Sequence, residues 1–284
     1  GQVLKLDDQD MKLITMCGMS ALFSAVFGTP IAATVFVIEF ISIGIMHYSA
    51  LVPCLTASAV AHFTAIQFGA EAEVYTIVET TAFAPIACVK VLVLGVVCAV
   101  VGICFCFLLH KVSKLLKQYG YNDYVRILGG GTLIMCLTVL TGCYDYNGSG
   151  TAIIEQAIAG KAVWYAFLLK MIFTAITLGS GYKGGEIVPS FFIGSTMGCV
   201  VGPLLGLPAS LSAAMGLIGV FCAVVNCPMA SIIMSIELFG SENLPFFAII
   251  CAVSYMLSGP FSLYSSQRIL YSKLEPRYVR QETM

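Results

Sequence analysis

The stretch GSGYKGGEIVPSFF, residues 179–192, places a lysine and a glutamate among four glycines between two apolar segments. The glycines end the helix expected before residue 179, and Pro189 favours the first turn of a new helix. A helix start exposes unpaired N–H groups and the positive end of the helix dipole, so a break at this point inside a membrane can hold a small anion. The other interpretation is a loop that only turns between two helices.

The composition around this stretch is that of a membrane protein. Of the 284 residues, 59% are hydrophobic and 10% are charged, and the mean hydropathy is +0.94. Residues 187–236 and 91–109 contain no Asp, Glu, Lys, Arg or His. Each of these runs can cross a bilayer, which requires about 20 apolar residues. We therefore predict a multi-pass protein of a cell membrane.

Charge and cysteine usage exclude several other classes. The net charge is −1 and the chain has no basic run, so no nucleic-acid partner is expected. The twelve cysteines lie mostly in apolar segments without a Cys-x-x-Cys pair, and the three histidines are scattered. Small core side chains are the better interpretation than a metal site or disulfides, and we expect neither a metal nor a cofactor.

The helices are predicted from apolar segments with polar breaks. They fall at 12–27, 30–47, 49–68, 84–113, 126–142, 162–178, 188–204, 211–225, 228–239 and 243–259, with a shorter helix near 151–159. Two pairs are separated only by the tripeptides Gly28-Thr29-Pro30 and Asn226-Cys227-Pro228. Proline restarts a helix in its first turn, and broken helices persist in lipid only where the freed backbone groups face protein or a polar cavity. This pattern is typical of a transporter or channel.

The same two breaks open an internal repeat. FGTPIAATVFVIEF (27–40) and VNCPMASIIMSIEL (225–238) share a proline, an alanine two residues later, and Ile-Glu at equal spacing, so that Pro30 and Glu39 correspond to Pro228 and Glu237. This similarity indicates the internal duplication found in many secondary transporters. Glu39 and Glu237 are either structural, as helix-end carboxylates at the membrane interface or as hydrogen-bonded packing residues, or they are groups that handle ions.

Four segments together resemble the family of CLC chloride channels and proton-coupled anion antiporters. GSGYKGGEIVP resembles the family's motif Gly-Ser/Gly-x-x-x-Gly-Gly-x-Phe-x-Pro at a half-membrane helix, and FGTPIAATVFVIEF resembles its segment Phe-Asn-x-Pro-x-x-Gly-x-x-Phe-x-x-Glu-Glu. YNGSGTAII is similar to its outer Gly-rich turn, and GPFSLYSSQ (259–267) to the start of its last helix. The order of the four segments agrees along essentially the whole chain.

The resemblance implies a binding site for the transported anion. By this carry-over, the anion lies at Gly185, Glu186, Ile187 and Val188, facing the backbone N–H groups of the last two, and receives a hydrogen bond from the Tyr264 hydroxyl. Tyr271, in a second Leu-Tyr-Ser, is the competing tyrosine.

The departures from the family pattern point to one of its branches. The gating glutamate and the Gly-Ser-Gly-Ile-Pro motif are expected upstream of Gly1, in a missing N-terminal part. The position of the internal proton-relay glutamate is Phe40. Glu186 stands where most members have an apolar residue, which resembles the fluoride-exporting branch with its Gly-Gly-Glu-Val-Thr-Pro motif. Glu186 is therefore a candidate for proton coupling, with a buried structural acceptor as the alternative.

These features predict an all-α polytopic membrane protein, an N-terminally truncated inverted-repeat bundle with half-membrane helices. One transmembrane domain covers 1–284, with 1–125 ending the first repeat and 126–284 forming the second, and no soluble regulatory domain is expected to follow. Since many eukaryotic members of the family carry such a domain, the resemblance implies a bacterial-type protein of the inner or plasma membrane. The predicted function is transport of chloride or fluoride by a channel or proton-coupled antiporter, as a homodimer in the lipid bilayer. The alternative is a broken-helix cation-coupled solute symporter. An enzyme is not expected, because no catalytic cluster is apparent in the sequence.

Overall fold

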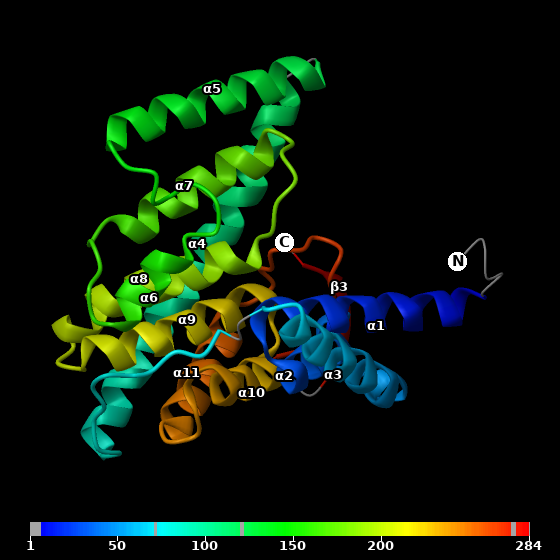
Figure 1. Cartoon of the computed structure of the whole chain (residues 1–284), viewed down its shortest axis with the longest axis vertical. Coiled ribbons are helices and arrows are strands. Elements are labelled where there is room, and N and C mark those ends of the chain that lie inside the picture. Colours follow the sequence, from blue (N-terminus) through cyan, green and yellow to red (C-terminus); the bar gives the residue numbers. More distant parts are fainter. Residues whose placement is uncertain (1–6, 71–72, 120–121, 274–276, 284) are drawn as a thin grey trace. The chain divides into compact units, whose positions relative to one another are not determined.

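A computed structural model describes residues 7–70, 73–119, 122–273 and 277–283 (Figure 1). The described residues form eleven α-helices and one small sheet, and they group into two compact units. Five helices are long and apolar enough to cross a membrane: Asp8–Phe27, Tyr48–Gln67, Pro85–Gln118, Asp123–Thr141 and Ile187–Leu204. The prediction of a helical multi-pass protein is confirmed, with the sheet as an addition.

The first unit joins residues from the beginning and the end of the chain. Its helices are α1 (Asp8–Phe27), α2 (Pro30–Phe40), the short 3₁₀ helix η1 (Tyr48–Ala50), α3 (Leu51–Gln67) and α10 (Pro228–Phe239). α1 packs along α3, where the Ser20 and Ser24 hydroxyls donate to the carbonyls of Cys54 and Ser58. Small polar side chains thus bring the two backbones close, as is common between membrane helices.

A three-stranded sheet in this unit corrects the predicted helix 30–47. Helix α2 ends at Phe40, and β1 (Ser42–Ile43) then pairs in parallel with β2 (Arg268–Tyr271), which pairs antiparallel with β3 (Tyr278–Glu282). Gly44 has φ +89°, and a Cβ at this position would collide with the Cβ of Tyr271. The chain therefore leaves the helix to join the strand, although the residues between 41 and 47 remain mostly apolar.

The second unit contains the remaining helices. They are α4 (Pro85–Tyr119), α5 (Asp123–Thr141), α6 (Thr151–Ile158), α7 (Ala166–Gly179), α8 (Ile187–Leu204), α9 (Ala209–Val225) and α11 (Leu244–Leu257), which begins at the boundary. α9 is buried along nearly its whole length and forms the centre of the unit. The division into repeats at residues 125 and 126 concerns sequence duplication rather than packing, and it stays a prediction.

The two predicted helix breaks have the same backbone geometry. Gly28 and Asn226 both have left-handed conformations, with φ of 70° and 59°. The residues that follow, Thr29 and Cys227, have φ/ψ of −118°/75° and −121°/76°. Since a positive φ is uncommon for a residue other than glycine, its presence at Asn226 supports the repeat indicated by the sequence.

The two equivalent glutamates cap each other's helices. The Glu237 carboxylate accepts from the N–H groups of Ile31, at 3.0 Å, and Ala32, at 2.8 Å, at the start of α2. The Glu39 carboxylate accepts from the N–H groups at the start of α10, those of Met229, at 3.2 Å, and Ala230, at 2.9 Å. Each carboxylate satisfies amides that have no partner within their own helix and lies at the positive end of its dipole. Of the two interpretations of Glu39 and Glu237, the hydrogen-bonded packing residue is the one that the contacts support.

We expect Glu237→Ala to destabilise the protein by about 2 kcal/mol or more, because two amides lose a charged acceptor. Glu39→Ala is expected to cost a similar amount, and Glu39→Gln less, because the amide oxygen still accepts a hydrogen bond. Thermal unfolding of the purified complete protein in detergent measures these effects.

The matched control is Glu155→Ala, which removes an exposed carboxylate on α6. Equal melting temperatures for Glu237→Ala and this control would contradict the capping role.

Candidate functional site

The start of α8 presents unpaired backbone donors. The helix begins at Ile187, and the first N–H that returns to the backbone is that of Ser190, which donates to the Glu186 carbonyl at 3.3 Å. Pro189 has no N–H, and within the described residues the amides of Ile187 and Val188 have no hydrogen-bond acceptor. Two adjacent donors at the positive end of a helix dipole form an anion-binding arrangement.

Helix α8 is held in place by direct backbone packing on α9. A Cβ placed on Gly198 would collide with the Ser212 carbonyl oxygen, and one on Gly194 would lie 2.8 Å from the Cα of Leu217. From the other side, a Cβ on Gly216 would lie 2.9 Å from the Cα of Gly198. Only glycine allows the two helices to approach this closely, as in other membrane helix pairs built from small residues. The helix that carries the candidate site is therefore fixed by glycines on both sides.

The Gly-rich segment before α8 is fastened to α5. The Arg126 side chain donates from Nε to the Ser180 carbonyl at 3.2 Å, and the Tyr182 hydroxyl donates to the Ile127 carbonyl at 3.0 Å. Gly181 has φ +100° and would bring a Cβ to 3.2 Å from the Arg126 guanidinium. The segment is therefore an ordered connection, and its course requires glycine at position 181.

Glu186 lies at the entrance to α8 with an unsatisfied carboxylate. Its side chain is partly buried, and the atom Oε2 is inaccessible to solvent and has no hydrogen-bond partner in the described chain. Lys183 is exposed and forms no ion pair with Glu186 in the described chain, so this neighbouring lysine does not compensate the charge of the carboxylate. These contacts give little support to the alternative that Glu186 is a structural acceptor.

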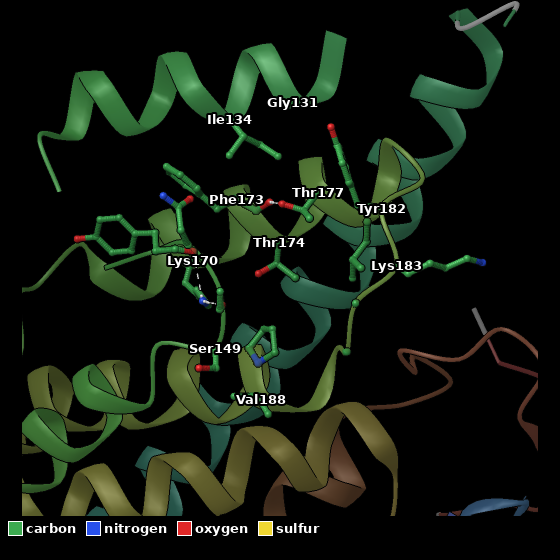
Figure 2. A pocket seen from close by; sticks show the side chains of 17 residues that line it. Gly131, Ile134, Ser149, Lys170, Phe173, Thr174, Thr177, Tyr182, Lys183 and Val188 are labelled. Atoms are coloured by element: carbon green, nitrogen blue, oxygen red, sulfur yellow. Dashed lines mark hydrogen bonds between the residues drawn. The ribbon is translucent and has the colours of Figure 1, made fainter. Parts of the chain in front are cut away.

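A cavity of about 570 Å³ opens beside the start of α8 (Figure 2). It lies wholly within the second unit, between α5, the loop before α6, α7 and the Gly-rich segment. Gly185 and Val188 line it, whereas Glu186 and Ile187 are not among its lining residues. A Cβ on Gly185 would meet no atom within 4 Å, so this part of the wall is open.

The candidate tyrosines lie in different units. Tyr264 follows α11 in the second unit and is half-buried; its segment is fixed because the Leu263 N–H donates to the Val224 carbonyl at 3.0 Å. Tyr271 lies in β2 of the first unit, where its ring packs edge-on against Tyr278. Tyr264 is not among the residues that line the cavity, and its hydroxyl as an anion donor stays a prediction.

Lys170 is the residue of this region that the sequence interpretation passed over. It is the only charged residue between Lys161 and Lys183, in the middle of an apolar helix, and its side chain is 1% exposed. A lysine in such a segment is rare and expensive, which is the signal that could have identified it.

Comparisons with known proteins agree on one family. The model of the family described as voltage gated chloride channel matches residues 1–259. The chain is 36% identical over 277 residues to a "Chloride/fluoride channel protein" of Pseudomonas syringae pv. tomato, covering 95% of this chain and 61% of the relative. It therefore spans about three fifths of that protein's length.

Solved structures give the same result. The crystal structure of a CLC-type fluoride/proton antiporter matches with a TM-score of 0.87 and 37% identity over 90% of this chain and 65% of that one. A slow cyanobacterial Cl⁻/H⁺ antiporter matches with a TM-score of 0.74 and 17% identity over 91% of this chain and 64% of that one, a likeness of fold alone.

Proposed function

Because this chain belongs to the voltage-gated chloride channel family, we propose that the complete protein moves fluoride or chloride across a membrane in exchange for protons. The observation that carries the proposal is the start of α8, where the Ile187 and Val188 amides are unpaired and Glu186 lies beside them without a hydrogen bond at Oε2. Fluoride is the favoured substrate, since the 37% identical structure is that of a fluoride/proton antiporter. The resemblance also implies a homodimer in the bilayer, with one pathway in each subunit.

The unpaired amides at the start of α8 are suited to weak, reversible binding of an anion, which transport requires. They place partial positive charge at the anion without a fixed cation, so an anion can bind and leave again. In the proposed pathway the Tyr264 hydroxyl is the side-chain donor, and the Glu186 carboxylate takes up and releases the proton. A solute symporter remains the second candidate from the sequence, but the described contacts of this site give no observation in its favour.

The test is efflux of fluoride and chloride, measured with ion-selective electrodes, from liposomes that contain the complete protein. We expect fluoride efflux well above that of protein-free liposomes, accompanied by proton movement in the opposite direction. Ile187→Pro removes one anion-facing N–H at the first helical position, where proline itself fits, but a following proline disfavours the αR backbone of Glu186, so the fold of this variant is checked separately. We expect this variant to transport at least ~10-fold more slowly, as for the loss of one charged hydrogen bond.

Ile187→Val is the control, because it keeps the amide and changes only the side chain. If Ile187→Pro folds normally and transports as fast as Ile187→Val, the anion does not use this amide. If the unmodified protein moves neither fluoride nor chloride, the proposed function is wrong.

A further inference from the structure

Lys170 is a buried cation without a counter-charge in the described chain. Its ammonium donates to the carbonyl oxygens of Gly148, at 2.7 Å, and Tyr146, at 3.2 Å, and lies 4.9 Å from the centre of the Phe192 ring. All three partners are neutral, and no carboxylate within the described residues forms an ion pair with it. Burial raises the pKa of Tyr146, in the loop after α5, to about 12, so its phenol is also uncharged at neutral pH.

The ammonium has bonding capacity left over. It carries three N–H donors, of which the two carbonyls occupy two. A buried charge that is solvated only by dipoles is costly, and an anion placed next to it would recover much of that cost. In the described chain, Lys170 therefore has an uncompensated positive charge and one unused N–H donor, and a negative ion could satisfy both.

The space for such an ion is the cavity beside α8. Lys170 and Thr174 lie one helical turn apart on α7 and both line it. Figure 2 shows the Thr174 hydroxyl directed to the side of the Lys170 ammonium, with Ser149 in the loop that the ammonium contacts, whereas the Lys183 side chain extends away. No aspartate or glutamate is among the lining residues. The wall thus combines a cation with hydroxyl donors and lacks carboxylates, which is a lining suited to an anion.

We propose that Lys170 holds a small hydrated inorganic anion in this cavity, as a waiting site next to the amides of α8. A volume of about 570 Å³ is far more than one bare halide needs, so the ion keeps part of its water. Val188, which carries one of the unpaired amides, and Lys170 line the same cavity, so an anion held at Lys170 would share that cavity with the start of α8. The inference rests on the proposed function for its role in transport, but the binding of an anion at Lys170 can be tested independently.

The first experiment locates the ion. Crystals of the complete protein grown in sodium bromide are expected to show an anomalous peak within hydrogen-bonding distance of the Lys170 Nζ atom. Crystals of the Lys170→Gln variant are expected to lose this peak while keeping any peak at the α8 amides. A side-chain carboxylate from another segment of the complete protein in the cavity, or no peak in the unmodified protein, would overturn the proposal.

The second experiment measures the consequence for transport. Glutamine still offers an N–H donor to the carbonyls of Tyr146 and Gly148 but carries no charge. An effect of Lys170→Gln on transport therefore reports mainly the loss of the positive charge. We expect it to raise the fluoride concentration at half-maximal efflux by ~10-fold or more, as for the loss of one charged hydrogen bond, with a smaller change in maximal rate. Lys161→Gln, which removes an exposed lysine from a neighbouring loop, is the control.

The outcomes separate this inference from the proposed function. A lowered maximal rate with an unchanged half-maximal concentration would assign Lys170 a structural role and overturn the waiting site. A bromide peak at Lys170 in a protein that transports neither halide would support the binding site and refute the function. Normal transport without the peak, and without an effect of Lys170→Gln, would refute the binding site alone.

Discussion

Replacing Glu186 with glutamine is expected to abolish proton exchange while the protein still folds. Glu186 immediately precedes the two unpaired amides of α8, and its Oε2 atom has no partner in the described chain. An ionised carboxylate there competes with an anion for the same positive potential, whereas a protonated one does not. We therefore expect anion binding to favour protonation of Glu186, and glutamine, which does not titrate at neutral pH, is expected to remove this coupling.

The measurement is proton uptake driven by a fluoride gradient in liposomes with the complete protein. We expect the signal from Glu186→Gln to fall to that of protein-free liposomes. Fluoride efflux is to be measured in parallel, because it shows whether the anion still passes without its proton.

The matched control is Glu155→Gln, which makes the same chemical change at an exposed site on α6. Proton uptake by Glu186→Gln equal to that of this control would show that another group carries the proton. Glu186 would then be a structural acceptor, the alternative weighed from the sequence.

Replacing Gly198 with leucine is expected to prevent recovery of folded protein. Even a Cβ at this position would collide with the Ser212 carbonyl, and a backbone atom cannot turn aside as a side chain can. Helices α8 and α9 would have to separate along a contact that both glycines of the pair, Gly198 and Gly216, make possible. The cost is about 3 kcal/mol or more, at the upper end for overpacked cores.

Size-exclusion chromatography of the detergent-solubilised protein measures this effect as the loss of the monodisperse peak. Gly129→Leu on α5 is the control, because a Cβ there would meet no atom within 4 Å. A monodisperse, thermally stable Gly198→Leu protein would show that α8 and α9 are not packed backbone to backbone.

Local signals predicted much of this fold. The tripeptides that end at Pro30 and Pro228 located both helix breaks, because a left-handed residue two positions before the proline ends one helix and the proline starts the next. The glycine cluster located the start of α8 within one residue of the prediction at 188. Membrane helices are clear in sequence since lipid demands a continuous apolar segment.

What the sequence did not predict depends on contacts between distant residues. The parallel pairing of Ser42 with Arg268 has no local signature, so the prediction continued α2 to residue 47. The small residues of α8 were present as Gly194 and Gly198, but they show a packing motif only once α9 is known as the partner. The sequence and the family resemblance identified residues 185–188 of the candidate site. The cavity and the burial of Lys170 could not be predicted in this way, because they depend on how α5, the loop before α6, α7 and the Gly-rich segment pack together.

Because Glu39 of α2 caps α10 and Glu237 of α10 caps α2, neither helix start is capped until both helices have been synthesised. The acceptor for the Ile31 amide is translated 206 residues after it, and the Glu39 carboxylate must wait for Met229, 190 residues later. Until α10 emerges from the ribosome, a nascent α2 holds a charge and open amides that lipid cannot satisfy. The first half of this chain therefore needs water or the insertion machinery around it, and we expect a chain stopped before residue 228 to be degraded rather than to settle in the bilayer.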